Sequence, residues 1–147
     1  MKKNSYSVLD AIGNTPIVKI ENIYAKLESV NPSGSIKDRA ALEIVEDAER
    51  KGELKKGYTI VEASSGNTGI SLAMVAMVKG YKMVVVMPEN MSDERKQMIR
   101  AFGAELVLTS KAGSLNEAIA RTEEIARRPK HFMARQFANP ANVKAQE

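Results

Sequence analysis

The alternation of short apolar runs with segments of helical length is the feature that most limits how this chain can fold. KMVVVM, residues 82–87, is continuously apolar after its first lysine, as is typical of a strand buried on both faces. Further β-type runs are TIVEA, ELVLT and HFMA, at residues 59–63, 105–109 and 131–134. A single helical segment lies between consecutive runs. This order predicts an α/β fold with three layers, in which helices cover both faces of a mostly parallel sheet.

Turn and capping residues predict where the first helices end. Apolar residues recur at helical spacing from residue 36 to about residue 51, and Gly52 can end that helix. A second helix is expected from residue 68 to about residue 79, followed by Gly80. Before these helices, IVKI (17–20) and IYAKLE (23–28) predict two short strands.

Two more helices are expected in the second half of the chain. Ser92 can cap a helix that ends at Gly103. Ser114 and Glu117 fit a capping box for a helix that runs to Arg127. Right-handed crossovers would bring the carboxyl ends of all strands to one edge, where open α/β sheets bind ligands. The loops SSGN, PENMS, TSKAGS and RQFANPAN follow these ends, so function is expected among them and at the helix start near residue 37.

Composition excludes several kinds of chemistry. The 147 residues contain no cysteine and one histidine, His131, so thiolate sites and disulfides are excluded and no metal site is predicted. A net charge of +4 with both signs interspersed gives no reason to expect a nucleic-acid partner. The first ten residues lack the apolar core of a secretory signal, and no apolar run reaches about 18 residues. We therefore expect a cytoplasmic protein without a membrane partner.

Lys37 lies in the first turn of a predicted helix, directly after the loop NPSGS. The unpaired N–H groups of a helix start carry partial positive charge and disfavour a cation by about 0.3 to 1 kcal/mol. On this residue alone we favour a solvated lysine whose charge is offset by Asp38 and Glu28. The alternative is an amine whose pKa is lowered by this potential and by partial burial, because a neutral amine attacks carbonyl groups to form Schiff bases.

The segment EASSGNTG, residues 62–69, joins a predicted strand to a helix. Thr68 or Asn67 can cap the helix, and the turn's N–H groups with the hydroxyls of Ser64, Ser65 and Thr68 can bind a small anion such as a carboxylate or phosphate. An ordinary helix cap remains the alternative. The segment is neither a GxGxxG fingerprint nor a phosphate-binding Walker loop. RQFANPAN is either a polar exit loop or a source of hydrogen bonds from Gln136 and the asparagines into the same crevice.

Five segments in this order, IGNTP, KLESVNPSGSIKDR, EASSGNTG, MPENMSDERK and RQFANPAN, together resemble the cysteine synthase and cystathionine β-synthase family of pyridoxal-phosphate enzymes, the fold type II group. The resemblance extends over nearly the whole chain. It implies that Lys37 holds the cofactor covalently and that Asn67 bonds to the hydroxyl oxygen of its ring. It also implies that Ser64, Ser65, Thr68 and Gln136 bind the carboxylate of a small amino-acid substrate.

The resemblance further implies a β-replacement reaction, in which O-acetylserine and sulfide give cysteine and acetate. Family members are about twice as long, and the loop that binds the cofactor phosphate lies in their second half. We therefore expect residues 1–147 to be the N-terminal, lysine-bearing domain, with an incomplete pyridoxal-phosphate site and little activity alone. Residues 11–34 are expected to pack on a complementary C-terminal half or to be exchanged in self-association. The alternatives are a cystathionine β-synthase-like half and a non-catalytic association module.

Overall fold

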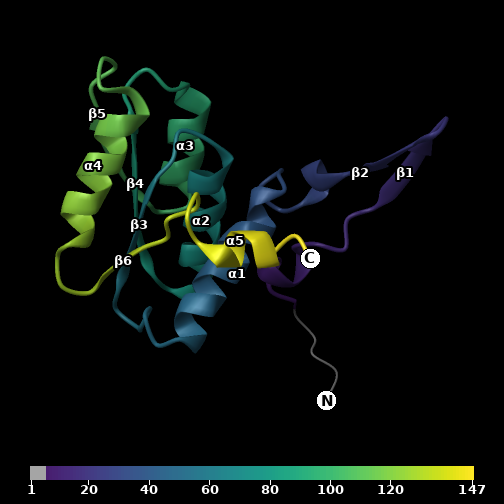
Figure 1. Ribbon diagram of the computed structural model, residues 1–147, viewed down its shortest axis with the longest axis horizontal. Helices are drawn as coiled ribbons and strands as arrows, with labels where there is room; N and C mark the ends of the chain where they lie inside the picture. Colours follow the sequence, from purple (N-terminus) through teal and green to yellow (C-terminus); the bar gives the residue numbers. More distant parts are fainter. Residues whose placement is uncertain (1–5) are drawn as a thin grey trace.

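The computed structural model describes residues 6–147 (Figure 1). Residues 1–5, which belong to the ten-residue start that lacks the apolar core of a secretory signal, lie outside the described residues. The helices and strands in chain order are η1 (Val8–Ala11), β1 (Ile17–Ile20), β2 (Ile23–Lys26), η2 (Glu28–Val30), α1 (Lys37–Arg50), β3 (Thr59–Ala63), α2 (Asn67–Lys79), β4 (Lys82–Pro88), α3 (Asp93–Ala101), β5 (Glu105–Thr109), α4 (Ser114–Ala126), β6 (His131–Met133) and α5 (Pro140–Lys144). Within residues 6–147, no helix is both long and apolar enough to span a lipid bilayer.

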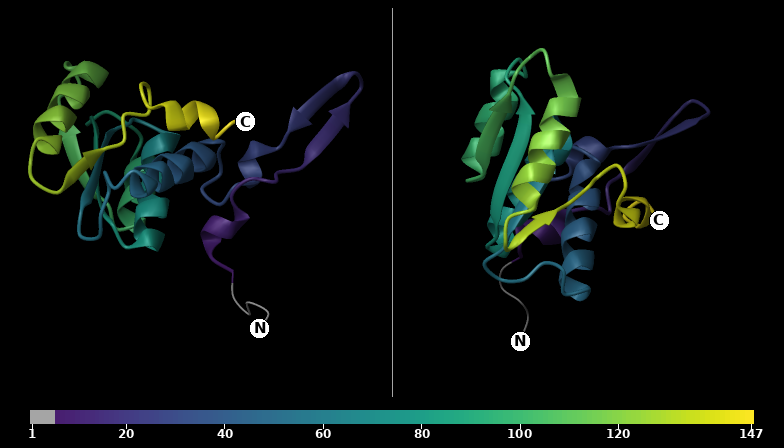
Figure 2. Two further views of the ribbon diagram at one scale, coloured as in Figure 1. Left: turned by 60° about the horizontal axis from the view of Figure 1, so that its bottom comes forward. Right: turned by 60° about the vertical axis from the view of Figure 1, so that its left-hand side comes forward.

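The four later strands form one parallel sheet in the order β5-β4-β3-β6. Helices α1, α2 and α3 cover one face of this sheet and α4 covers the other (Figures 1 and 2). The predicted three-layer arrangement with helices on both faces is therefore confirmed. Because the strands are parallel, the loops that follow β3, β4, β5 and β6 all lie at one edge of the sheet.

Strand β4 shows why its sequence is continuously apolar. Met83, Val85 and Met87 pack into the core beneath α1 and α2, whereas Val84 and Val86 pack against α4. All five side chains are buried. Alternate side chains of a strand point to opposite faces, so a strand between two helical layers needs apolar residues at every position. Burial of each such side chain contributes about 1.5 to 3 kcal/mol.

Strands β1 and β2 form an antiparallel hairpin that projects away from the sheet domain (Figure 2). Several large apolar side chains on it are more than 60% exposed, namely Ile17, Ile20, Ile23 and Tyr24. Strand β2 ends at Lys26, two residues before the predicted end, because Glu28 begins the short helix η2.

Glu28 and Arg39 connect the base of this hairpin to α1. The Arg39 guanidinium donates to the Glu28 carboxylate from Nε at 2.8 Å and from Nη2 at 3.0 Å. Thr15 and Asn31 donate to the same carboxylate at 2.5 and 2.9 Å. These donors, Arg39 above all, lower the pKa of Glu28 to about 2, although burial opposes the shift. The expectation that Glu28 offsets the charge of Lys37 is wrong, because the Glu28 carboxylate pairs with Arg39.

The predicted capping box at the start of α4 is also wrong. Ser114 adopts a φ of 47°, and the N-cap position is occupied by Gly113 without a side-chain hydrogen bond. The Glu117 carboxylate instead accepts the hydroxyl of Ser110 in the preceding loop. The loop folds back over the helix start, so the Glu117 carboxylate that a capping box would use is bound by Ser110.

The segment RQFANPAN, residues 135–142, leads into a short helix, α5, which begins at Pro140 and packs against α1. Asn139 caps α5 by accepting the backbone N–H of Ala141 at 3.0 Å, and Pro140 is its first residue. The sequence analysis treated this segment as a loop and missed the Asn-Pro pair, which is a favourable helix start.

Candidate functional site

Three segments meet at the carboxyl edge of the sheet around a cavity of about 240 Å³. They are the start of α1, the turn between β3 and α2, and the loop after β6; Leu115 at the start of α4 completes the lining. The cavity is lined by every residue that the sequence analysis assigned to a site: Lys37, Ser64, Ser65, Asn67, Thr68 and Gln136. Their roles toward a ligand stay predictions, but the fold brings them together from positions up to a hundred residues apart in the chain.

Lys37 is the first residue of α1 and is partly buried. Its backbone N–H donates to the Ser35 hydroxyl at 3.2 Å, which ties the helix start to the preceding loop. Asp38, which was expected to offset its charge, is fully buried and accepts hydrogen bonds from Ser33 and Ser71. Both carboxylates named as neutralising partners of Lys37 are therefore engaged elsewhere.

The Ser64 side chain stabilises the turn between β3 and α2 through hydrogen bonds to its backbone. Its buried hydroxyl accepts the N–H groups of Gly69 at 2.9 Å and of Gly66 at 3.4 Å. The predicted cap by Thr68 or Asn67 is wrong, because Gly66 occupies the N-cap position and the N–H of Gly69 is accepted by Ser64 instead. Within residues 6–147, the N–H groups of Asn67 and Thr68 have no hydrogen-bond acceptor. Two free N–H groups at a helix start are suited to binding an anion.

Gln136 joins the loop after β6 to this turn. Its side chain is 8% exposed, and its amide nitrogen donates to the Ala63 carbonyl at 3.2 Å. The Thr68 hydroxyl donates to its amide oxygen at 2.5 Å. An amide nitrogen has two hydrogens, so Gln136 keeps one donor that the Ala63 carbonyl does not use.

Glu62 is a buried acid near the site that the sequence analysis overlooked. Its side chain is 2% exposed, and in the described part of the chain its Oε2 has no hydrogen-bond partner. Burial raises the pKa of Glu62 to about 7, although the backbone N–H groups of Gln136 and Arg135 and the Gln136 side chain oppose the shift. The available signal was a glutamate inside the otherwise uncharged strand TIVEA, since buried acids are uncommon in cores.

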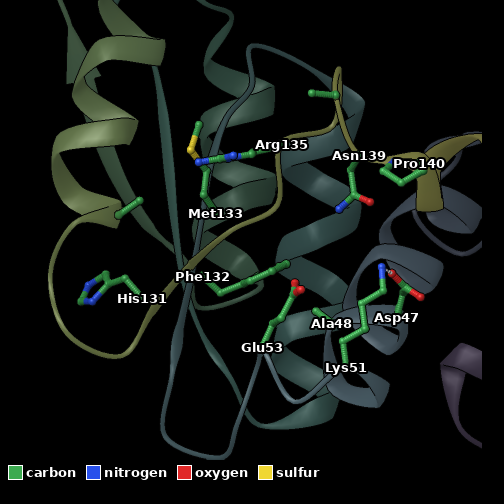
Figure 3. A pocket seen from close by; sticks show the side chains of 12 residues that line it. Asp47, Ala48, Lys51, Glu53, His131, Phe132, Met133, Arg135, Asn139 and Pro140 are labelled. Atoms are coloured by element: carbon green, nitrogen blue, oxygen red, sulfur yellow. Dashed lines mark ion pairs between the residues drawn. The ribbon is translucent and has the colours of Figure 1, made fainter.

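A larger hollow of about 470 Å³ lies between α1 and the edge strand β6 (Figure 3). None of the predicted site residues lines it. Its charged side chains include Lys51 and Asp47, which pair with each other at 2.5 Å. Its Asn139 amide donates to the Ala134 carbonyl at 3.0 Å. These three side chains already have partners within the chain, whereas the smaller cavity at the carboxyl edge gathers all the predicted site residues and is the candidate site.

The donors of the candidate site suit a ligand that has both a carbonyl and an anionic group. Lys37 supplies a primary amine that can condense with an aldehyde. The free N–H groups and hydroxyls at the start of α2 supply donors for a carboxylate on the same side of the cavity. Asn67 is exposed at the rim and offers an amide to a ring substituent. The residues present therefore fit a bound aldehyde cofactor together with an amino acid.

Residues 8–147 match the family described as pyridoxal-phosphate dependent enzymes. The chain is 54% identical over 146 residues to the cysteine synthase of a Flavobacterium species, covering 94% of this chain and 48% of that protein. It is 48% identical over 139 residues to cysteine synthase B of Escherichia coli, covering 89% of this chain and 46% of that protein.

Solved structures agree with these sequence matches. The cysteine synthase of Entamoeba histolytica has a TM-score of 0.92 at 39% identity, over 99% of this chain and 47% of its own. O-ureido-L-serine synthase has a TM-score of 0.90 at 49% identity, over 95% of this chain and 46% of its own. The chain thus spans about half the length of the relatives it matches.

Proposed function

The chain belongs to the pyridoxal-phosphate dependent enzymes, and from that premise we propose that it supplies the lysine-bearing half of a cysteine synthase-type active site. The observation that carries the proposal is the convergence of Lys37, the turn of residues 64–68 and Gln136 on one cavity. The similarity to cysteine synthases supports the reaction type.

In the proposed reaction, O-acetylserine loses acetate from its β-carbon and sulfide adds in its place to give cysteine. Pyridoxal phosphate, when bound, supplies a conjugated ring that takes up the electron pair left at the α-carbon. Lys37 would hold the cofactor through its amine, and the same amine would serve as the general base that accepts the α-proton.

The remaining site residues orient the two small molecules. Asn67 bonds to the ring hydroxyl of the cofactor. The free N–H groups at the start of α2, together with Ser64, Ser65, Thr68 and the remaining hydrogen of the Gln136 amide, hold the substrate carboxylate. This arrangement sets the α-proton toward Lys37 and keeps the β-substituent free to leave.

We infer that residues 1–147 alone bind the cofactor weakly and turn over slowly. The resemblance assigns the loop for the cofactor phosphate to the second half of family members, so residues 1–147 would hold the cofactor without its main electrostatic anchor. A cystathionine β-synthase-like half remains the alternative, because the same residues serve either nucleophile. A cytoplasmic location stays a prediction.

Two measurements test this proposal. Adding pyridoxal phosphate to the chain should give a visible absorption band that Lys37→Arg, which keeps the charge but does not condense, abolishes. A sensitive assay of cysteine formation from O-acetylserine and sulfide should show far less turnover than Escherichia coli cysteine synthase B under the same conditions. A band that survives in Lys37→Arg contradicts the assignment of the lysine, and normal turnover contradicts the incomplete site.

A second candidate function is association without catalysis, and the exposed hairpin favours it. Ile20 and Ile23 are 61% and 70% exposed at the tip of an arm that stands away from the domain (Figure 1). Exposed apolar side chains of this kind mark interaction surfaces. We propose that residues 11–34 pack on a complementary C-terminal half or are exchanged with a second copy. A monomeric mass in sedimentation, without binding of a hydrophobic dye, would count against it.

A further inference from the structure

Asp38 is buried between the two helices that carry the candidate site. It directly follows Lys37 in α1, and its side chain is 0% exposed. Its Oδ2 accepts the backbone N–H of Ser33 at 2.7 Å, and its Oδ1 accepts the hydroxyl of Ser71 at 2.6 Å and that of Ser33. A buried carboxyl group is unfavourable unless hydrogen bonds satisfy it, so these donors hold Asp38 in one position.

The donors come from both sides of the cavity. Ser33 lies in the loop that leads to Lys37, whereas Ser71 lies on α2, four residues after Asn67. Residues four apart lie on the same side of a helix, so Ser71 is one turn below the start of α2 that lines the cavity. The two hydroxyl oxygens are 3.0 Å apart and close the group into a three-membered cluster. Asp38 therefore links the helix start that bears the amine to the one that bears the anion-binding turn.

The three consecutive charged residues of α1 have three different surroundings. Lys37 lines the cavity, Asp38 contacts α2, and Arg39 contacts Glu28 at the base of the hairpin. Successive side chains of a helix point about 100° apart, so these contacts surround the first turn of α1. The apolar core packs α1 against α2 along their length, and the directional hydrogen bonds of Asp38 add a constraint at the two helix starts.

We propose that Asp38, through Ser33 and Ser71, is a positioning residue that fixes the Lys37 amine against the turn of residues 64–68. The inference rests on the proposed function, because the position of the amine matters only if it condenses with a bound aldehyde. Asp38 itself does not line the cavity and does not touch the ligand.

The first experiment measures how fast Lys37 is labelled. The wild-type chain and its variants are incubated with pyridoxal 5′-phosphate, reduced with borohydride and digested, and the label at Lys37 is followed by mass spectrometry. Misplacement of a reacting group by about 1 Å can slow a reaction by about a hundredfold. We expect labelling to be roughly tenfold slower in Ser71→Ala and up to about a hundredfold slower in Asp38→Ala. Asp47→Ala, at the other end of α1, is the matched control and should label as the wild type does.

A conservative variant separates positioning from simple stability. In Asp38→Asn the side-chain oxygen can still accept the Ser33 N–H, and the amide hydrogens can donate to the two hydroxyls. Asp38→Asn should therefore keep most of the labelling rate at equal folded fraction. A loss as large as in Asp38→Ala, or unchanged labelling in both Ser71→Ala and Asp38→Ala, overturns the inference.

The second experiment uses no cofactor. Hydrogen exchange of the Ser33 amide, whose acceptor is Asp38, should be faster in Asp38→Ala than in the wild type, while exchange in the core stays unchanged. Should Asp38→Ala fail to fold, Ser71→Ala, which removes one donor, gives the decisive comparison for the whole 31–37 loop. An absence of Lys37 labelling in the wild type defeats the proposed function, whereas unchanged loop exchange in the variants defeats the positioning role.

Discussion

Replacing Glu62 by glutamine removes a buried carboxyl group and keeps its size. The Glu62 side chain is 2% exposed, and burial raises its pKa from 4.5 to about 7. Between these pH values the folded chain binds a proton at Glu62 that the unfolded chain has released. The free energy of unfolding therefore falls as pH rises from 4.5 to about 7. Above that range the contribution of Glu62 to this free energy no longer changes with pH. A difference of about 2.5 between the two pKa values corresponds to about 3 kcal/mol.

Urea denaturation at pH 4.5, 6 and 8 measures this effect for the wild type and for Glu62→Gln. Subtracting the two curves cancels the titration of every other group. The stability of Glu62→Gln relative to the wild type should rise by about 3 kcal/mol between pH 4.5 and pH 8. Parallel stability curves would refute the reasoning, because they would show that Glu62 has the same pKa in the folded and unfolded chain.

Two further predictions concern the turn and the hairpin. In Gly69→Ala the new Cβ would lie 3.0 Å from Val85 Cγ1 and 3.2 Å from Ser64 Cβ, so crowding should outweigh the usual helix gain of alanine and destabilise the fold by about 1 kcal/mol net. Thermal denaturation measures this, and a stabilised variant would contradict it. The lowered pKa of Glu28, from 4.5 to about 2, contributes stability that is lost as pH falls through that range. In Glu28→Gln the free energy of unfolding should fall less steeply between pH 5 and pH 2 than in the wild type. A denaturation series in which both chains lose the same stability over this range would disprove it.

The layered sheet could be predicted because its signals are local. The central strand β4 carries an apolar run that burial on both faces explains, and the other strands carry short β-type runs between helical segments. The same rule places the turn of residues 64–68 and the loop with Gln136 at one edge, since parallel strands end there. Lys37 reaches that edge because it begins α1, which precedes β3 and has its start beside the turn. The roles of these residues rest on the family resemblance and on the proposal above.

The side-chain networks could not be predicted because they depend on which distant residue arrives nearby. Glu28 and Asp38 were both expected to offset the charge of Lys37 because they lie near it in the sequence. In the fold, Glu28 instead binds Arg39, and Asp38 accepts a hydrogen bond from Ser71. Ser71 lies in the apolar run ISLAMVAMV, where a serine resembles a small core residue. Only the packing of α2 on α1 shows that its hydroxyl has a partner.

The proposed function depends on which lysine condenses with the cofactor. The chain is incubated with pyridoxal phosphate, reduced with borohydride and mapped by peptide mass spectrometry, with Lys37→Ala treated in parallel. Our account predicts that the adduct is concentrated at Lys37 and that no other lysine replaces it in the variant. An adduct spread over surface lysines such as Lys51, unchanged in Lys37→Ala, would contradict it.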